Sequence, residues 1–365
     1  MKILMISRST LFSSPGGDTI QIENTAKFLK KLKNIDIDIK LSDENINYSQ
    51  YTLIHFFNII RPNDILYHIE KTNLPFVIST IFVDYSEYEK SARKGFLKYL
   101  NYFFSSDTLE YLKMIARILK GQEKLRSYSY LYLGHKKSIQ KIINQTKFLL
   151  PNSKNEYDRL IKHFDSKNYY KVIPNAIDLN IFNLHNKKID KLYQDSIICV
   201  GRIEGRKNQL NLIKAVNRTQ FKLFIIGNKS PNQFSYYNEC INEASSNSNI
   251  KFIEHTTQED LSLIMRSAKV HALISWFETT GLVSLEAAYL GCNLIITDKG
   301  DQREYFEDMA TYCNPDSIDT IVEALNIAHN KPFNEKLKLK IKNKYTWDKT
   351  AEETYKAYQE VLGVK

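Results

Sequence analysis

Two acidic residues, Glu278 and Glu286, have a spacing that suits a ligand site within the run Ile274-Ser-Trp-Phe-Glu-Thr-Thr-Gly-Leu-Val-Ser-Leu-Glu. An apolar strand ends near the start of this run, Gly281 permits a sharp turn, and a helix follows. Glu278 would then lie beyond the carboxyl end of the strand, where open parallel sheets bind ligands. Carboxylates there suit a hydroxyl-rich ligand, because they accept paired hydrogen bonds from sugar or ribose hydroxyls. The alternative is a surface acid followed by an acid that favours the helix dipole.

A second candidate site is the basic run Val200-Gly-Arg-Ile-Glu-Gly-Arg-Lys-Asn, which lies between a predicted strand and a predicted helix. Its two glycines allow close backbone approach, and Arg202 and Lys207 could hold a diphosphate, the first as a fork and the second as a point charge. Amides at the start of the helix after Gly281 would add donors for an anion. We therefore count Thr280, Gly281 and Leu282 among the predicted diphosphate contacts. The alternative is a solvated basic turn.

A glycine pair, Gly16-Gly17, forms a third and weaker candidate within Ser14-Pro-Gly-Gly-Asp-Thr. It follows the first predicted strand and precedes a predicted helix over Thr19–Leu32. The run is not G-x-G-x-x-G, so the dinucleotide fingerprint is missing. A glycine pair at a helix N-terminus can still approach a phosphate, although glycines after a strand are more often only a turn.

These groups need parallel sheets to position them, and the chain alternates short β-branched runs with longer helical patterns. The predicted strands are Lys2–Ser7, Ile35–Leu41, Thr52–Phe56, Phe76–Thr80, Phe148–Pro151, Lys171–Ile173, Ser196–Val200, Phe221–Ile226, Ile250–Phe252, Val270–Ile274 and Asn293–Thr297. Between the later strands we predict helices over Asn208–Val216, Glu259–Ser267 and Val283–Leu290. The pattern restarts after Pro174-Asn175. The sequence thus predicts an α/β protein with two Rossmann-like domains facing across a cleft, residues 1–173 and 174–345.

The last segment, residues 346–365, carries an apolar face with helical spacing at Ala351, Tyr355, Tyr358 and Leu362. A helix with one apolar face must pack against other elements, and we expect this one to return to the first domain.

The net charge of +10 comes from one segment. Residues 90–147 hold 13 basic and 3 acidic side chains, whereas residues 174–365 hold 24 of each. Within the basic segment, Lys94, Lys98, Lys113 and Arg117 alternate with large apolar groups, a pattern typical of helices at an anionic membrane interface. The alternative is a pair of helices that pack inward and expose a basic face. No nucleic-acid-binding motif accompanies the charge, so we expect no nucleic acid partner.

Several classes of protein are excluded by what the chain lacks. No apolar run reaches the ~18–20 residues of a membrane-spanning helix, and Met1–Ser7 is too short for a signal peptide. The four cysteines show no metal-like spacing, so we expect no bound metal and a reduced, cytoplasmic protein. Cys199 and Cys292 stand in apolar runs and are predicted to be core residues.

Together these residues resemble the family 4 glycosyltransferases, which retain anomeric configuration and have the GT-B fold. Glu278 and Glu286 match the E-x7-E signature of that family, inside a match that continues through Gly291 and Thr297-Asp298. Pro174-Asn-Ala-Ile-Asp looks like the interdomain P-N-G-V-D segment, with Ala176 in place of glycine.

The resemblance also implies roles for the site residues. Arg202 and Lys207, with Gly201, match the diphosphate-binding loop, and Gly16-Gly17 falls where the family has its glycine loop. Glu278 would contact the transferred sugar, and Glu286 would contact the nucleotide ribose.

The first half departs from the family pattern at Phe82, where many members have the histidine of a T-x-H motif near the reacting sugar. Another group could take that role. Asp84, two residues on, could accept a hydrogen bond from the acceptor hydroxyl, and His55 ends an apolar strand. The alternatives are a loop-capping acid for Asp84 and a buried, hydrogen-bonded histidine for His55.

The resemblance implies a retaining glycosyltransferase of bacterial surface-glycan synthesis, of the lipopolysaccharide type. It would transfer a sugar from a UDP- or GDP-linked donor to a saccharide that a lipid carries, at the inner face of the cell membrane, without a metal or other cofactor. Two alternatives remain open at this point: a GT-B-fold epimerase acting on a nucleotide sugar, and a non-catalytic scaffold that docks on membranes.

Overall fold

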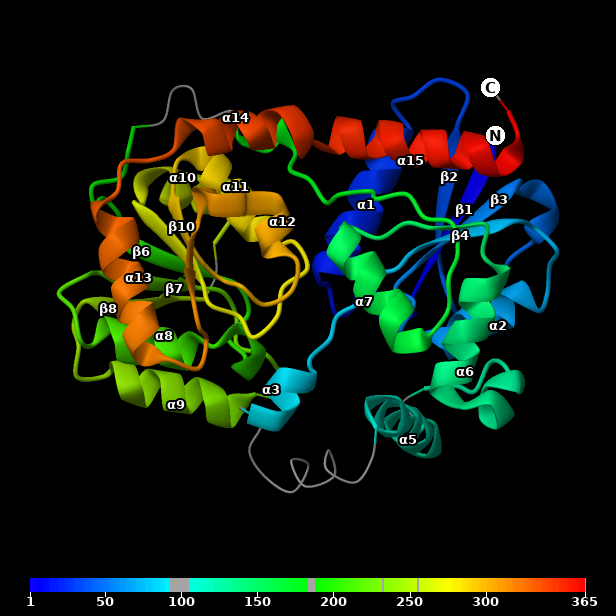
Figure 1. Ribbon diagram of the computed structural model, residues 1–365, viewed down its shortest axis with the longest axis horizontal. Coiled ribbons are helices and arrows are strands. Elements are labelled where there is room, and N and C mark those ends of the chain that lie inside the picture. Colours follow the sequence, from blue (N-terminus) through cyan, green and yellow to red (C-terminus); the bar gives the residue numbers. More distant parts are fainter. Residues whose placement is uncertain (92–104, 122, 183–187, 232, 255, 365) are drawn as a thin grey trace. The chain divides into compact units, whose positions relative to one another are not determined.

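The computed structural model describes residues 1–91, 105–121, 123–182, 188–231, 233–254 and 256–364. The described residues form two compact units. The first comprises Met1–Ser86, Lys94–Asn175 and Trp347–Lys365, and the second comprises Glu87–Arg93 and Ala176–Thr346. Figure 1 shows a sheet covered by helices in each of them. No described helix combines the length and the apolarity that crossing a membrane requires.

The first unit is built on a parallel sheet of five strands in the order β2-β1-β3-β4-β5. The strands are β1 (Lys2–Ser7), β2 (Asp36–Leu41), β3 (Leu53–Phe57), β4 (Phe76–Ser79) and β5 (Phe148–Leu149). The helices are α1 (Gly17–Leu29), α2 (Pro62–Ile69), α5 (Ser106–Leu119), α6 (Ser129–Gln145), α7 (Lys154–Phe164) and α15 (Trp347–Leu362). β1 and β3 are buried on both faces, which explains why they read as continuous apolar runs.

One predicted strand, Lys171–Ile173, is wrong. Only Tyr170 forms a bridge with Leu149, although the amides of Lys171 and Ile173 donate to Leu149 and Pro151 at 3.0 and 2.8 Å. Pro151 has no N–H to donate in return, so the pairing ends there.

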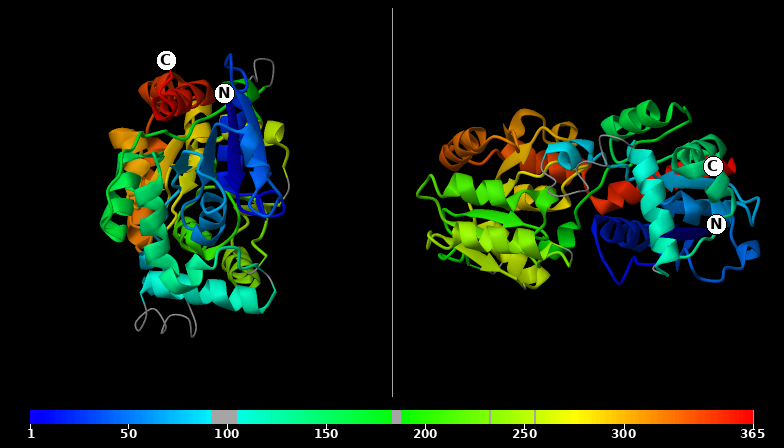
Figure 2. Two further views of the ribbon diagram at one scale, coloured as in Figure 1. Left: turned by 90° about the vertical axis from the view of Figure 1, so that its right-hand side faces the viewer. Right: turned by 90° about the horizontal axis from the view of Figure 1, so that it is seen from below.

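The helix predicted after residue 346 is α15, which packs along α1 (Figure 2). Ala351 and Tyr358 of its predicted apolar face are buried. The Thr350 hydroxyl donates to the carbonyl of Pro174 at 2.8 Å. These contacts all lie within the first unit, to which α15 belongs.

The second unit is built on a parallel sheet of six strands in the order β11-β10-β9-β6-β7-β8. The strands are β6 (Ile197–Val200), β7 (Leu223–Ile226), β8 (Ile250–Ile253), β9 (Val270–Leu273), β10 (Asn293–Thr297) and β11 (Thr311–Cys313). The helices are α3 (Ser86–Ser91), α8 (Gln209–Val216), α9 (Phe234–Ala244), α10 (Gln258–Ser267), α11 (Leu282–Leu290), α12 (Gln302–Phe306), α13 (Ile318–Asn330) and α14 (Glu335–Lys344).

Alternate residues of β6 enter two different cores. Ile198 and Val200 pack into the core beneath α11, whereas Ile197 and Cys199 pack into the core beneath α8 and α13. Cys199 and Cys292 are fully buried free thiols, as predicted. A sheet with helices on both faces leaves only its edges and strand ends to bind a ligand.

Candidate functional site

Lys207 and Glu278, predicted from two separate motifs, are in direct contact. Lys207 ends a short turn after β6, and Glu278 lies in the loop after β9. Because β6 and β9 are adjacent parallel strands, their carboxyl ends meet at one edge of the sheet. The Lys207 ammonium donates to the Glu278 carboxylate, and both side chains are mostly buried. The arrangement places a cation and a carboxylate, both predicted to contact the donor, at the same point.

The loop that carries Glu278 is held by a second loop after β10. The Glu278 amide donates to the carbonyl of Lys299 at 3.2 Å, and the Glu278 carbonyl accepts from the amide of Asp301 at 2.9 Å. Between them, Gly300 has a φ of +93°, and a β-carbon at this position would lie 2.0 Å from the Glu278 carbonyl oxygen. Only glycine fits this close approach. No sequence motif predicted a role for Gly300, although the family match reached Thr297-Asp298, just before it.

The predicted diphosphate loop is also built on a close backbone approach. Gly201 has a φ of +147°, and a β-carbon on Gly227 would lie 2.3 Å from the Gly201 carbonyl oxygen. Gly227, which follows β7, is therefore a second glycine that the sequence analysis missed. The Trp276 amide donates to the Arg206 carbonyl at 2.9 Å and ties this loop to the one that carries Glu278.

The two arginines of the diphosphate loop differ in what they contact. Arg206 is engaged with Glu204 at 3.0 Å. Arg202, the predicted ligand contact, is exposed, and its guanidinium has no partner among the described residues. Arg202 is therefore free to bind an anion at this edge of the sheet.

The start of α11 lies in the same loop region. Gly281 caps the helix in a left-handed conformation with a φ of +68°, and its carbonyl accepts from the amide of Ser284 at 2.8 Å. The first amides of a helix, here beginning with Leu282, have no partner within the helix and can bind an anion. Thr280 is fully buried, and its hydroxyl donates to the Tyr305 hydroxyl at 3.1 Å, so its predicted contact with the diphosphate stays a prediction.

Glu286 lies on α11 and is half-buried. Burial raises the pKa of its carboxyl from 4.5 to about 7. The Glu286 carboxyl has no hydrogen-bond or ion-pair partner within the described part of the chain. A carboxyl that burial penalises and no protein group satisfies is suited to hydroxyl groups of a ligand.

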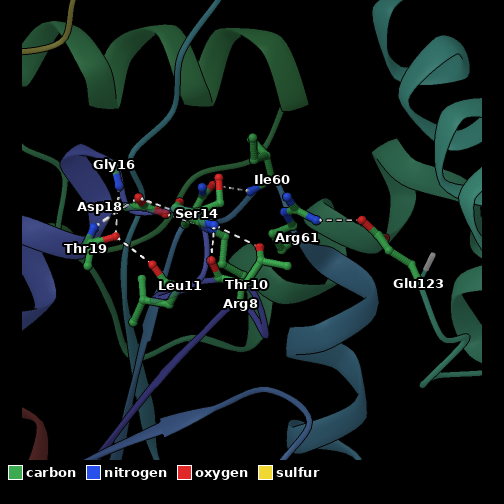
Figure 3. Close-up of polar contacts among 11 residues, drawn as sticks. Arg8, Thr10, Leu11, Ser14, Gly16, Asp18, Thr19, Ile60, Arg61 and Glu123 are labelled. Carbon is green, nitrogen blue, oxygen red and sulfur yellow. Dashed lines mark hydrogen bonds and ion pairs between the residues drawn. The ribbon is translucent and has the colours of Figure 1, made fainter. Parts of the chain in front are cut away.

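The glycine loop of the first unit is closed by an arginine that the sequence analysis did not single out (Figure 3). The Arg8 guanidinium binds both carboxylate oxygens of Asp18, at 2.7 and 3.0 Å, and the carbonyls of Thr10 and Ser14 at 2.8 and 2.9 Å. Gly16 caps α1, and its amide donates to the Thr19 hydroxyl at 3.0 Å. The helix therefore begins at Gly17, two residues before the predicted start.

His55 is a buried residue of the first unit and not a ligand contact. Its two ring nitrogens lie 2.6 Å from the Tyr358 hydroxyl and 2.9 Å from the Ser79 hydroxyl. Burial lowers the pKa of its imidazole to about 3. The expectation that His55 acts on substrate is wrong, because α15 covers it and both of its nitrogens are hydrogen-bonded.

Phe82 is also a core residue. Its ring packs against Phe164, and its amide donates to the buried carboxylate of Glu156 at 2.9 Å. Arg159 donates to the Phe82 carbonyl at 2.7 Å. Asp84 follows in the loop and is half-buried, and its role stays a prediction.

The fold and these motifs resemble those of GT-B glycosyltransferases of the family 4 type. Residues 181–347 match the family model described as glycosyl transferases group 1. Among solved structures, the chain resembles a sucrose-phosphate synthase from Thermosynechococcus elongatus, with a TM-score of 0.74 and 14% identity over 99% of each chain. It also resembles the Anabaena protein HepE in complex with UDP and glucose, with a TM-score of 0.68 and 15% identity over 99% of this chain and 100% of that one. The expected resemblance and fold are thereby confirmed.

The curated relatives have names that indicate different activities. A probable sucrose-phosphate synthase of Thermosipho melanesiensis is 28% identical over 55% of this chain and 49% of its own length. An uncharacterised glycosyltransferase of Methanocaldococcus jannaschii is 27% identical over 46% of each chain, so this chain spans about half the length of both relatives. A Campylobacter jejuni enzyme named as an N-acetylgalactosaminyltransferase acting on a diphospho-undecaprenol saccharide is 25% identical over 82% of each chain. Within the described residues, no group of three or more His, Cys, Asp or Glu side chains could hold a metal ion.

Proposed function

We propose that this protein is a retaining glycosyltransferase that moves a sugar from a nucleotide sugar to a saccharide acceptor. The observation that carries the proposal is the contact between Lys207 and Glu278 at the carboxyl edge of the second sheet. Exposed Arg202 and the start of α11 belong to the same group of loops. The names of the relatives support the same class of reaction.

The site residues divide the work between the two ends of the donor. As the bond from the anomeric carbon to the phosphate oxygen breaks, Lys207, Arg202 and the first amides of α11 stabilise the negative charge that develops on the diphosphate. Glu278 accepts hydrogen bonds from hydroxyls of the transferred sugar, and Glu286 accepts them from the ribose. The acceptor oxygen bonds to the anomeric carbon on the same face, and its proton passes to the departing phosphate oxygen. That front-face course follows from the family resemblance.

The test is the Glu278→Gln variant. We expect turnover to fall about 100-fold, because a charged hydrogen bond is worth roughly 1.5–3 kcal/mol. Binding of UDP or GDP, which lack the sugar, should change little. Glu323→Gln, an exposed glutamate on α13, is the matched control. Turnover near the wild-type value in the Glu278 variant contradicts the proposal.

A panel of nucleoside diphosphates and sugar nucleotides identifies the donor. A ligand at 100 times its dissociation constant stabilises the folded state by about 2.7 kcal/mol, which a thermal-shift assay detects. Product formed without acceptor would instead indicate the epimerase, and vesicle binding without donor consumption would indicate the scaffold.

The finer part of the proposal concerns the acceptor. We propose that a lipid carries it and that the protein works on the cytoplasmic face of an anionic membrane, docked through α5, α6 and the turn between them. Large apolar side chains are exposed there, namely Leu112, Leu119, Tyr128, Leu131 and Tyr132. Exposed lysines accompany them, namely Lys120, Lys124, Lys136, Lys137 and Lys147. The acceptor printed in the Campylobacter relative's name supports the lipid carrier.

The alternative of inward packing accounts for only one face of α5. Tyr111, Met114 and Ile118 pack toward the core, and the exposed apolar residues lie elsewhere on the helix. Lys113 and Arg117 pair with Glu110 and Glu123, so they carry less of the free charge than the sequence suggested. Lys94 and Lys98 lie outside the described residues.

Charge neutralisation tests the docking surface. Replacing Lys120, Lys124, Lys136 and Lys137 together by glutamine should abolish sedimentation with anionic vesicles, since each lysine contributes about 1 kcal/mol near such a surface. Donor hydrolysis should persist. The matched control replaces four exposed lysines of the second unit, Lys222, Lys251, Lys331 and Lys336. Equal vesicle binding by both variants contradicts the docking proposal.

A further inference from the structure

The helix α3 comes from the first half of the sequence, but residues 87–93 belong to the second unit (Figure 1). It begins soon after β4 and the loop that holds Asp84. None of the motifs in the sequence predicted that a segment from this part of the chain would reach the donor-binding loops.

Tyr88 of α3 packs directly on the diphosphate loop. A β-carbon on Gly205 would lie 2.4 Å from the Tyr88 hydroxyl oxygen and 3.3 Å from the ring carbon that carries it. The Tyr88 ring centre is 6.4 Å from that of Trp276. Gly205 does not have a positive φ, so its backbone would accept alanine. Tyr88 is therefore the reason that position 205 has no room for a side chain.

Glu87 of the same helix contacts the loop after β10, which supports Glu278. The Lys299 ammonium donates to the Glu87 carboxylate at 2.6 Å, and the Lys299 carbonyl accepts the Glu278 amide. Two neighbouring residues of α3 thus contact the loop that carries Lys207 and the loop after β10 that supports Glu278.

We propose that Tyr88 and Glu87 are positioning residues for the donor: α3 holds both loops in the geometry that binds a nucleoside diphosphate. Docking of α3 and binding of the diphosphate then reinforce each other, because both favour the same loop arrangement. This inference rests on the proposed function. If it is right, donor binding by the second unit depends on α3, a helix from the first half of the sequence.

A size-exchange pair of substitutions tests it. Gly205→Ala drives a methyl group into the Tyr88 hydroxyl, and we expect UDP or GDP affinity to fall about tenfold, since overpacking in a packed contact has this order of effect. Tyr88→Phe removes the clashing oxygen and keeps the ring that packs on the diphosphate loop. The double variant should regain affinity to within about twofold of the wild type, because a ring carbon at 3.3 Å is a tight but tolerable neighbour.

Amide hydrogen exchange of residues 86–91 gives a readout that needs no ligand. Exchange should rise in Gly205→Ala and return to the wild-type rate in the double variant. If Gly205→Ala changes neither exchange nor affinity, or if Tyr88→Phe fails to rescue both, the proposal is overturned. If the wild type binds neither UDP nor GDP, the proposed donor fails, and exchange alone still decides whether α3 docks on the loop.

A charge exchange provides a second test of the same contact. Glu87→Lys places two cations together and should raise exchange over residues 86–91, whereas adding Lys299→Glu should lower it again. Exchange that is equally high in the single and the double variant contradicts the role of Glu87.

Discussion

Replacing Gly300 by alanine would press a methyl group against the backbone of Glu278, the residue that we expect to bind the transferred sugar. The new β-carbon would lie 2.0 Å from the Glu278 carbonyl oxygen and 2.9 Å from its carbonyl carbon. The Glu278 carbonyl cannot simply rotate away, because it accepts the Asp301 amide while the Glu278 amide binds Lys299. Relief of the overlap therefore requires a shift of about 1 Å in the Glu278 loop, since carbon and oxygen need roughly 3 Å or more.

The cost has two parts. Alanine at a φ of +93° is strained by about 1–2 kcal/mol, and the collision adds about 1–3 kcal/mol. For a unit of this size, each kcal/mol lowers the melting temperature by roughly 2–4 °C, so we expect a total fall of about 4–20 °C. Turnover should fall further than stability suggests, by about 100-fold, because a 1 Å misplacement of a positioning group has that effect.

Gly291→Ala is the matched control. Gly291 has a φ of +106°, so alanine carries the same kind of backbone strain, but no atom lies within 4 Å of its β-carbon position. The difference between the two variants, measured by thermal unfolding and by release of nucleotide from the donor, isolates the collision with Glu278. Equal melting temperatures and equal turnover in the two variants would refute the reasoning.

Three further predictions follow from contacts within each unit. Glu286→Gln should raise the melting temperature relative to the wild type more at pH 8 than at pH 5. The pKa of the Glu286 carboxyl is about 7 in the folded protein and near 4.5 in the unfolded chain, so the wild type loses stability as the pH rises through that range. A pH-independent difference would contradict this. Gly227→Ala, whose β-carbon would meet the Gly201 carbonyl at 2.3 Å, should weaken UDP or GDP binding at least tenfold in calorimetry. His55→Leu and Tyr358→Phe should each lower the free energy of unfolding in urea by about 1–3 kcal/mol, because each removes the same buried hydrogen bond. The double variant should lose little more than the larger single effect, and additive losses would contradict this.

The sequence predicts well those strands whose short runs of apolar residues mark them without reference to distant parts of the chain. Strands such as β1 and β9 are short runs of buried apolar residues, and their identity needs no knowledge of distant partners. β11 was missed because only one of its three residues, Cys313, is buried, so it shows no apolar run.

The candidate site divides in the same way. Lys207 and Glu278 could be predicted because each directly follows a strand, and adjacent parallel strands bring their loops together. Gly227 and Gly300 could not be predicted, since the need for glycine at these positions comes from close contact with backbone atoms of other loops. His55 was misjudged because its hydrogen-bond partner, Tyr358, is 303 positions away in the chain. The contact of Tyr88 with Gly205 likewise joins segments that no local pattern relates.

The membership of residues 347–365 in the first unit has a consequence for how the chain matures during synthesis. During synthesis β1 and α1 leave the ribosome early, but α15, which packs on α1 and hydrogen-bonds His55, is made after the residues of the second unit. The second unit can complete its sheet while the first is still missing a helix. We therefore expect a chain that stops before α15 to hold all strands of the second unit, while its first unit lacks the helix that packs on α1 and hydrogen-bonds His55.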